Sequence, residues 1–127
     1  MNVVDSSCWL EVIENSPIGI GVAPIVEDKE NLVVPTIVLY EVFKKTTAMK
    51  GFDYARGFLP AMLGSNVVPL SIGLSIQAAQ ISRIYKLPTA DSIIYATVNQ
   101  YRAVLWTTDK HFDGLPNVRY FDKTRNG

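Results

Sequence analysis

The chain has 127 residues, of which 48% are hydrophobic and 19% charged, and its formal net charge is zero. This composition excludes intrinsic disorder and predicts a single domain over residues 1–127 with a core of its own. A neutral chain gives no global sign of a nucleic-acid partner, so local basic residues would have to meet any polyanion. One cysteine cannot form an intramolecular disulfide, and no leader or membrane-length apolar run is visible, so we expect a cytoplasmic protein without a membrane partner.

The chain opens with a strand, an acid and a helix. Residues 2–4 form a short apolar run, typical of a buried strand, and Asp5 follows it directly. Apolar residues then recur at helical spacing until an Asn-Ser-Pro turn, which predicts the first helix. Residues 18–31 are ambiguous. Their glycines and Pro24 disfavour a long helix, although residues 25–30 favour a short one.

The middle of the chain repeats the order of strand and helix. Residues 32–34 predict a second buried strand, and residues 36–49 predict the helix that follows it. Glu41 lies inside that helix between apolar neighbours, so we expect a heavily buried helix in which a carboxylate is unusual. Residues 52–63 predict another helix, and residues 67–70 a third strand.

The last part of the chain contains two helices and two strands. Residues 71–86 predict an amphipathic helix, and a second helix follows with Asp91 in its first turn. Residues 104–106 predict a buried strand that runs out just before Asp109, and residues 118–121 predict a final strand. The alternation of strands and helices predicts the α/β class, as a three-layer α/β/α sandwich around a mostly parallel sheet.

Four acids each have an ordinary structural explanation. Asp5 is placed to cap the first helix, and Glu41 can pair with Lys45 one turn later. Asp91 suits the positive end of its helix, and Asp109 suits a turn.

Taken together, the same four acids favour a shared site. In a parallel α/β fold, strand ends and the following helix starts meet at one edge of the sheet, where ligands bind. Clustered carboxylates repel one another, and a divalent cation is the usual remedy. Oxygen ligands select Mg²⁺ or Mn²⁺, and such a site is suited to phosphodiester hydrolysis.

Four stretches also carry a family resemblance. The order and spacing of these stretches resemble those of PIN-domain proteins, and the chain length is similar to that of the VapC-type toxins of prokaryotic toxin–antitoxin pairs. The stretches are Val4–Glu11, Pro35–Val42, Leu87–Ala96 and Thr107–Phe112.

The resemblance implies a metal-dependent endoribonuclease that cleaves structured RNA, a tRNA or a ribosomal RNA, and that is held inactive by a small antitoxin. It also implies a homodimer, although the glycine-rich residues 18–24 depart from the usual charged helix and leave the antitoxin groove and dimer contacts in question. The implied catalytic acids are Asp5, Glu41, Asp91 and Asp109, of which Asp5, Asp91 and Asp109 would bind Mg²⁺ or Mn²⁺, with Ser7, Thr107 and Asp113 in support.

Basic residues near these motifs have two interpretations. Lys45 and Lys110 could contact RNA phosphates, or they could belong to solvated faces. For His111, a solvent-facing or RNA-contacting position is expected rather than a direct catalytic one.

Other functional classes remain to be weighed. A receiver-type signalling domain needs an acceptor aspartate after its central strand, and Ser71 stands after residues 67–70. A phosphatase with an aspartyl nucleophile needs a second acid where Ser7 stands. These two features disfavour both classes, whereas a non-catalytic PIN-like or receiver-like metal-binding module in RNA processing or signalling stays open.

Overall fold

The computed structural model of the protein describes residues 1–126. Within them lies a five-stranded sheet in the order β3-β2-β1-β4-β5, and every neighbouring pair is parallel. The strands are β1 (Asn2–Val4), β2 (Leu32–Pro35), β3 (Asn66–Val68), β4 (Val104–Thr107) and β5 (Val118–Tyr120). The α-helices are α1 (Ser6–Ile13), α2 (Pro17–Glu27), α3 (Thr36–Lys50), α4 (Phe52–Leu63), α5 (Ile72–Tyr85), α6 (Thr89–Gln100) and α7 (Lys123–Asn126), and the 3₁₀ turns are η1 (Lys29–Asn31) and η2 (Lys110–Phe112).

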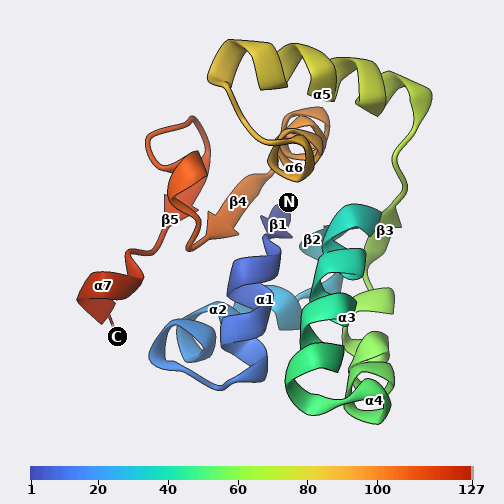
Figure 1. The fold of residues 1–127 in the computed structure, drawn as a ribbon, viewed down its shortest axis with the longest axis vertical. Helices are drawn as coiled ribbons and strands as arrows, with labels where there is room; N and C mark the ends of the chain where they lie inside the picture. The colour runs from blue at the N-terminus through green and yellow to red at the C-terminus, as the bar shows by residue number, and fades with distance from the viewer. Residues whose placement is uncertain (127) are drawn as a thin grey trace.

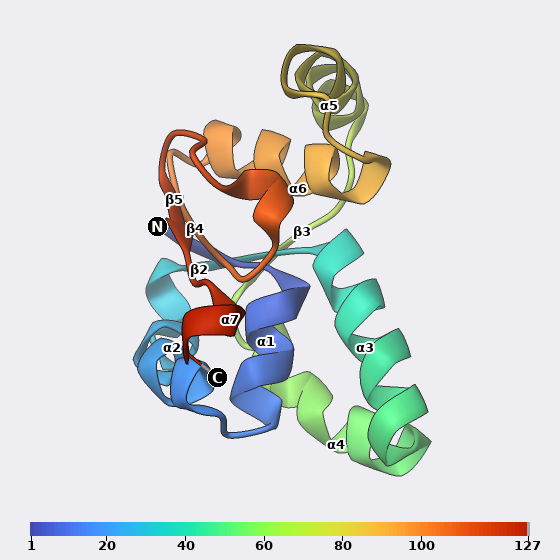
Figure 2. The same ribbon diagram turned by 60° about the vertical axis from the view of Figure 1, so that its left-hand side comes forward.

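The chain winds in two directions from the middle of the sheet. From β1 it passes to β2 and then to β3, and the helices of these connections, α1 to α4, lie on one side of the sheet (Figure 1). It then crosses back to β4 through α5 and α6, which lie on the other side (Figure 2). The predicted three-layer α/β/α sandwich is therefore confirmed. The strand order reverses between β1 and β4, and such a reversal opens a crevice at the carboxyl ends of the strands.

The central strands are apolar because helices cover both of their faces. Val3 and Val33 are fully buried in β1 and β2, as is Leu105 in β4. Parallel strands in this position show no alternation of polar and apolar residues, which is why these runs are recognisable in the sequence.

Helix α2 corrects the expectation for the ambiguous segment, because it spans Pro17–Glu27 rather than residues 25–30. Ser16 caps it, with its hydroxyl accepting a hydrogen bond from Gly19 N at 3.0 Å. Gly19 does not break the helix. It lets α2 approach α1 closely, since a Cβ at this position would lie 2.0 Å from the carbonyl oxygen of Glu11.

Helix α3 corrects a second expectation, that of a heavily buried helix. Its buried stripe consists of Val38, Val42 and Thr46, whereas Tyr40 is 58% exposed. Glu41 is half-buried beside this stripe. The carboxylate therefore lies at the border between core and solvent, where it can take part in a site at the surface.

Among residues 1–126, none of the helices has the length and apolar character needed to cross a membrane.

Candidate active site

The site lies where β1 and β4 end side by side. Asp5 directly follows β1, and Thr107 is the last residue of β4. The backbone N–H of Asp5 donates to the carbonyl of Trp106 at 2.9 Å, which holds the two strand ends together. The acids are thus at the strand-order reversal, the position at which open α/β sheets bind ligands.

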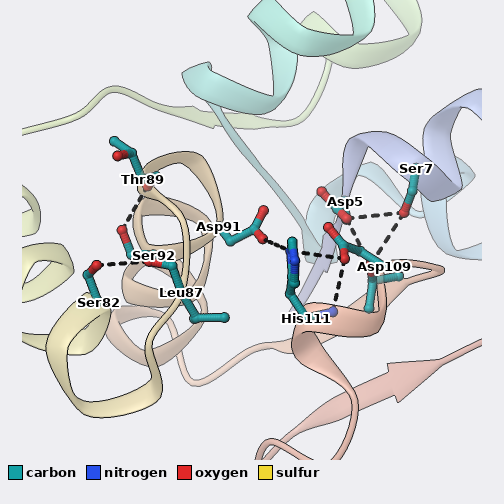
Figure 3. A network of polar contacts seen from close by, with 10 residues as sticks. Asp5, Ser7, Ser82, Leu87, Thr89, Asp91, Ser92, Asp109 and His111 are labelled. Carbon is teal, nitrogen blue, oxygen red and sulfur yellow. Dashed lines mark hydrogen bonds and ion pairs between the residues drawn. The ribbon is translucent and has the colours of Figure 1, made fainter.

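Asp5 is 4% exposed and accepts hydrogen bonds on both carboxylate oxygens. Its Oδ1 accepts from Ser6 N at 2.8 Å, which caps helix α1. Its Oδ2 accepts from Thr107 Oγ1 at 2.8 Å and from Ser7 Oγ at 3.1 Å (Figure 3). Burial raises the pKa of Asp5, and these hydrogen bonds oppose the rise. The cap and the site are therefore one arrangement.

The two hydroxyl groups also hold the loop after β4. Thr107 Oγ1 accepts from Asp109 N at 2.9 Å, and Ser7 Oγ accepts from Thr108 N at 3.0 Å. Each hydroxyl donates to Asp5 and accepts from the loop, so Asp5 and Asp109 are positioned by a shared network. The family resemblance implied a supporting role for Ser7 and Thr107, and these hydrogen bonds are the contacts through which they could fill it.

Asp91 and Asp109 face each other across His111. Asp91 stands in the first turn of α6, and its side chain is 13% exposed; that of Asp109 is 31% exposed. His111 Nδ1 lies 2.8 Å from Asp91 Oδ2 and 3.3 Å from Asp109 Oδ1 (Figure 3). The backbone N–H of His111 also donates to Asp109 Oδ1 at 2.9 Å, because η2 turns the chain back over the carboxylate.

The charges of the acids act on one another. Burial raises the pKa of Glu41, and the charges of Asp5 and Asp91 raise it further, whereas Lys45 lowers it. Burial also raises the pKa of Asp91; a hydrogen bond from His111 opposes this, and the charges of Asp109 and Asp5 add to it. These effects indicate that the four carboxylates lie close enough for their charges to interact.

Three further predicted residues lie at the margin. Asp113 is exposed just after η2, and its charge is not among the causes that raise the pKa of Asp5, Glu41 or Asp91. Lys45 and Lys110 are both exposed, the first one turn after Glu41 and the second at the start of η2.

One group of side chains has the spacing of a metal site. The ligand atoms of Asp91, Asp109 and His111 all lie within 4.8 Å of one another. Two carboxylates and an imidazole are a donor set that binds divalent cations, so these residues fit a metal ion. The family resemblance implied that Asp5 is also a metal ligand, but among residues 1–126 Asp5 lies outside this group. Thr107 connects Asp5 to Asp109, because its hydroxyl donates to the Asp5 carboxylate and accepts from the backbone N–H of Asp109.

The PIN domain family profile matches residues 3–117. The chain belongs to the PIN domain family. A search of curated protein sequences finds no match to it.

Solved structures of other PIN-type proteins have the same fold. A toxin–antitoxin complex from Klebsiella pneumoniae includes a chain of 20% identity and a TM-score of 0.79, with 94% of this chain and 96% of that chain covered. VapC20 of Mycobacterium tuberculosis, described as a sarcin-ricin loop cleaving toxin, has 17% identity and a TM-score of 0.72, with 94% and 99% covered. FitAcB from Neisseria gonorrhoeae has 16% identity and a TM-score of 0.70, with 96% and 97% covered. This PIN domain therefore shares the fold of toxins found with antitoxins.

The sequence did not reveal that His111 contacts both Asp91 and Asp109. Its side chain is 57% exposed, as a solvent-facing residue would be, but Nδ1 turns toward both acids. The available signal was the Asp-Lys-His spacing, which puts an imidazole two residues after an acid. That signal says nothing about Asp91, which reaches the same point from a different helix.

Proposed function

We propose that this PIN domain is a divalent-metal-dependent endoribonuclease and the toxin of a type II toxin–antitoxin pair, acting on structured RNA in the cytoplasm. The observation that carries the proposal is the meeting of four acids from four separate parts of the chain. Asp5 comes from the end of β1, Glu41 from α3, Asp91 from α6 and Asp109 from the loop after β4. A purely structural role would not require carboxylates whose charges raise the pKa of Glu41 and Asp91 at the carboxyl ends of the strands, the edge at which open α/β sheets bind ligands.

The donor set supports metal binding, with Asp91 and Asp109 as the carboxylates closest to a common point. A bound Mg²⁺ or Mn²⁺ would supply activation of water and neutralisation of the charge that develops on the phosphate.

The chain's own residues contribute orientation and proton transfer. Ser7 and Thr107 hold the Asp5 carboxylate in one orientation, so its charge is fixed relative to Asp109. Glu41 has a raised pKa and stands beside these acids, which suits a group that takes a proton from the attacking water. Lys45 lies one helical turn after Glu41 and Lys110 directly follows Asp109; both are exposed, and they suit contacts with the phosphates that flank the scissile bond.

Exposed apolar surfaces support the proposed protein partners. On α5, Ile72, Ile76 and Ile84 are exposed. A hollow of about 380 Å³ lies between α3 and α4, lined by Thr36, Leu39, Tyr40, Phe43, Lys44 and Leu59. Surfaces of this kind are suited to protein contacts, here an antitoxin and a second copy of the chain.

The test is cleavage of a panel of tRNAs and ribosomal RNA fragments, including a sarcin-ricin loop oligonucleotide. Purified protein is incubated with Mg²⁺, with Mn²⁺ or with a chelator, beside the Asp5→Asn protein as the control for contaminating nuclease. Cutting that requires both the cation and Asp5 supports the proposal.

A preparation shown to be free of antitoxin that cuts none of these RNAs under any condition would contradict it. The weight would then pass to a non-catalytic PIN-like module that binds metal or RNA without turnover.

A further inference from the structure

The imidazole of His111 is held in place against the two carboxylates. Its backbone N–H is bonded to Asp109 Oδ1, and Phe112, the next residue, is fully buried. The turn η2 is therefore anchored on both sides of the ring. His111 is also the only histidine among the 127 residues, so the chain has a single imidazole with which to bind a metal.

The spacing of the three side chains is that of neighbouring metal ligands. Adjacent ligands of an octahedral divalent cation with bonds of about 2.1 Å lie about 3 Å apart. The two distances from His111 Nδ1, 2.8 Å to Asp91 Oδ2 and 3.3 Å to Asp109 Oδ1, fall on either side of that value. The same ring atom faces both carboxylates, and the ligand atoms of all three groups lie within 4.8 Å of one another, which places them around a common point.

We propose that His111 Nδ1 is a direct ligand of the cation held by Asp91 and Asp109, and that this mixed site selects Mn²⁺ over Mg²⁺. The inference rests on the metal dependence of the proposed function and extends it to the identity of the ion. Mg²⁺ favours oxygen ligands and gives up its waters reluctantly, whereas imidazole nitrogen suits transition-metal ions. A site built from carboxylates alone would discriminate less between the two.

The competing explanation is a charged hydrogen bond. In that case His111 neutralises Asp91 and Asp109 in the free protein and must be displaced before a cation binds. The two explanations predict opposite effects of removing the ring. Loss of a ligand weakens Mn²⁺ binding, whereas loss of a competitor strengthens it.

The experiment measures Mn²⁺ and Mg²⁺ binding by calorimetry on the full chain, prepared without a histidine tag. His111→Asn is compared with the wild-type chain, because asparagine can offer a cation only its side-chain oxygen, so the change removes the nitrogen ligand and keeps a polar group near the position of Nδ1. Asp53→Asn is the matched control, since it changes an exposed acid in the first turn of α4, outside the group. We expect the wild-type chain to favour Mn²⁺ at least about tenfold, and His111→Asn to lose about tenfold in Mn²⁺ affinity with little change for Mg²⁺. Asp53→Asn should keep the wild-type ratio.

Pulsed electron paramagnetic resonance of the Mn²⁺-loaded chain gives a second readout. A coordinated imidazole produces ¹⁴N modulation, which must come from His111 and must vanish in His111→Asn. Absence of this modulation in the wild-type chain, or equal or tighter Mn²⁺ binding by His111→Asn, would overturn the inference.

These readouts separate the inference from the proposed nuclease. RNA cleavage with Mn²⁺ but without ¹⁴N modulation supports the proposed nuclease and contradicts His111 as a ligand. Modulation without cleavage of any RNA supports His111 as a ligand and contradicts the proposed nuclease. A chain that binds neither cation contradicts both.

Discussion

The two sides of the site differ in how the protein holds its acids. On one side, Asp5 is buried and accepts hydrogen bonds from a backbone N–H and two hydroxyls. On the other side, Asp91 and Asp109 are partly exposed and meet the imidazole of His111. The Asp5 side is thus part of the contact between β1 and β4, whereas the Asp91 side is open to a ligand. Changes on the first side should alter folding and activity together, and changes on the second should separate them.

The largest expected effect is on the open side. Asp91→Asn should lower RNA cleavage by at least about 10³-fold, or about 4 kcal/mol of transition-state stabilisation, because one of the two carboxylates proposed to hold the cation loses its charge. The free energy of unfolding should stay within about 0.5 kcal/mol or rise, since repulsion among the carboxylates is relieved. Cleavage assays and urea unfolding measure the two quantities.

Asp53→Asn is the matched control, because Asp53 is an exposed acid in the first turn of α4, just as Asp91 is in the first turn of α6. It should leave cleavage unchanged and cost a few tenths of a kcal/mol through the helix dipole. Undiminished cleavage by Asp91→Asn would remove this residue from the site.

The buried side should respond in stability as well. Thr107→Val removes a fully buried hydroxyl, which leaves Asp5 Oδ2 with one donor fewer and Asp109 N without its acceptor. We expect a loss of about 2 kcal/mol in the free energy of unfolding and a fall in cleavage. Ser7→Ala, at a half-buried position in the same network, should cost about 1 kcal/mol. Urea unfolding followed by tryptophan fluorescence measures both losses in the free energy of unfolding. A loss for Thr107→Val no greater than that for Ser7→Ala would contradict the expectation that the more buried hydroxyl contributes more to stability.

The free energy of unfolding of the metal-free protein should depend on pH through groups on both sides of the site. Burial raises the pKa of Asp5 and of Asp91, so the folded state binds protons more tightly than the unfolded state, and stability falls as the pH rises from about 4 through the folded pKa values. The hydrogen bond to Asp91 raises the pKa of His111 in the folded state. The contribution of His111 to the free energy of unfolding is therefore complete below about pH 6.5 and is lost as the pH rises through its folded-state pKa. Both effects have the same sign. The free energy of unfolding in the presence of a chelator should therefore decrease from about pH 5 to pH 8.

Asp91→Asn should flatten this decrease, because it removes one of the acids and the main partner of His111. Asp53→Asn should not change the profile. If the stability of the metal-free protein rises over the same pH range, the pKa values of these acids are not raised in the folded state.

The smallest effect concerns the exposed cations. Lys110→Gln and Lys45→Gln should each weaken RNA binding a few-fold and reduce the salt dependence of binding by about one counterion. Lys50→Gln is the control, because Lys50 lies at the far end of α3 against Glu14 and Tyr54. Fluorescence anisotropy with labelled RNA at several salt concentrations measures the affinity and its salt dependence. Equal effects of all three changes would mean that Lys45 and Lys110 act only through the overall charge of the surface and make no specific phosphate contacts.

The sequence was sufficient for the class of fold because its central strands are covered on both faces. Val3, Val33 and Leu105 belong to short apolar runs that end at an acid, a proline and a threonine respectively, and this pattern predicts a parallel sheet. It does not predict the strand order. The pairing of Thr107 with Asp5 joins residues that are 102 positions apart, and no local pattern contains that information.

The misjudged helices have tertiary causes. In α2, Gly19 suggested a break, but the close approach to Glu11 requires a residue without a Cβ. In α3, Tyr40 is apolar in sequence yet lies in the exposed lining of the hollow beside α4. The same limit applies to His111, since its neighbour Asp91 comes from another helix. Residue type indicated the chemistry of the site, whereas contacts between distant segments determine its geometry.

The join between β1 and β4 has a consequence for the timing of synthesis. Asp5 leaves the ribosome early, but its hydroxyl partner Thr107 and the facing Asp109 follow more than a hundred residues later. Chains fold from the N-terminus as they emerge, so β1 and β2 can pair while the acids remain unassembled. A nascent chain from which Thr107 and Asp109 have not yet emerged therefore lacks the connection between Asp5 and the loop after β4. Whatever activity these acids carry begins only after the chain has been made as far as β4 and the loop that follows it.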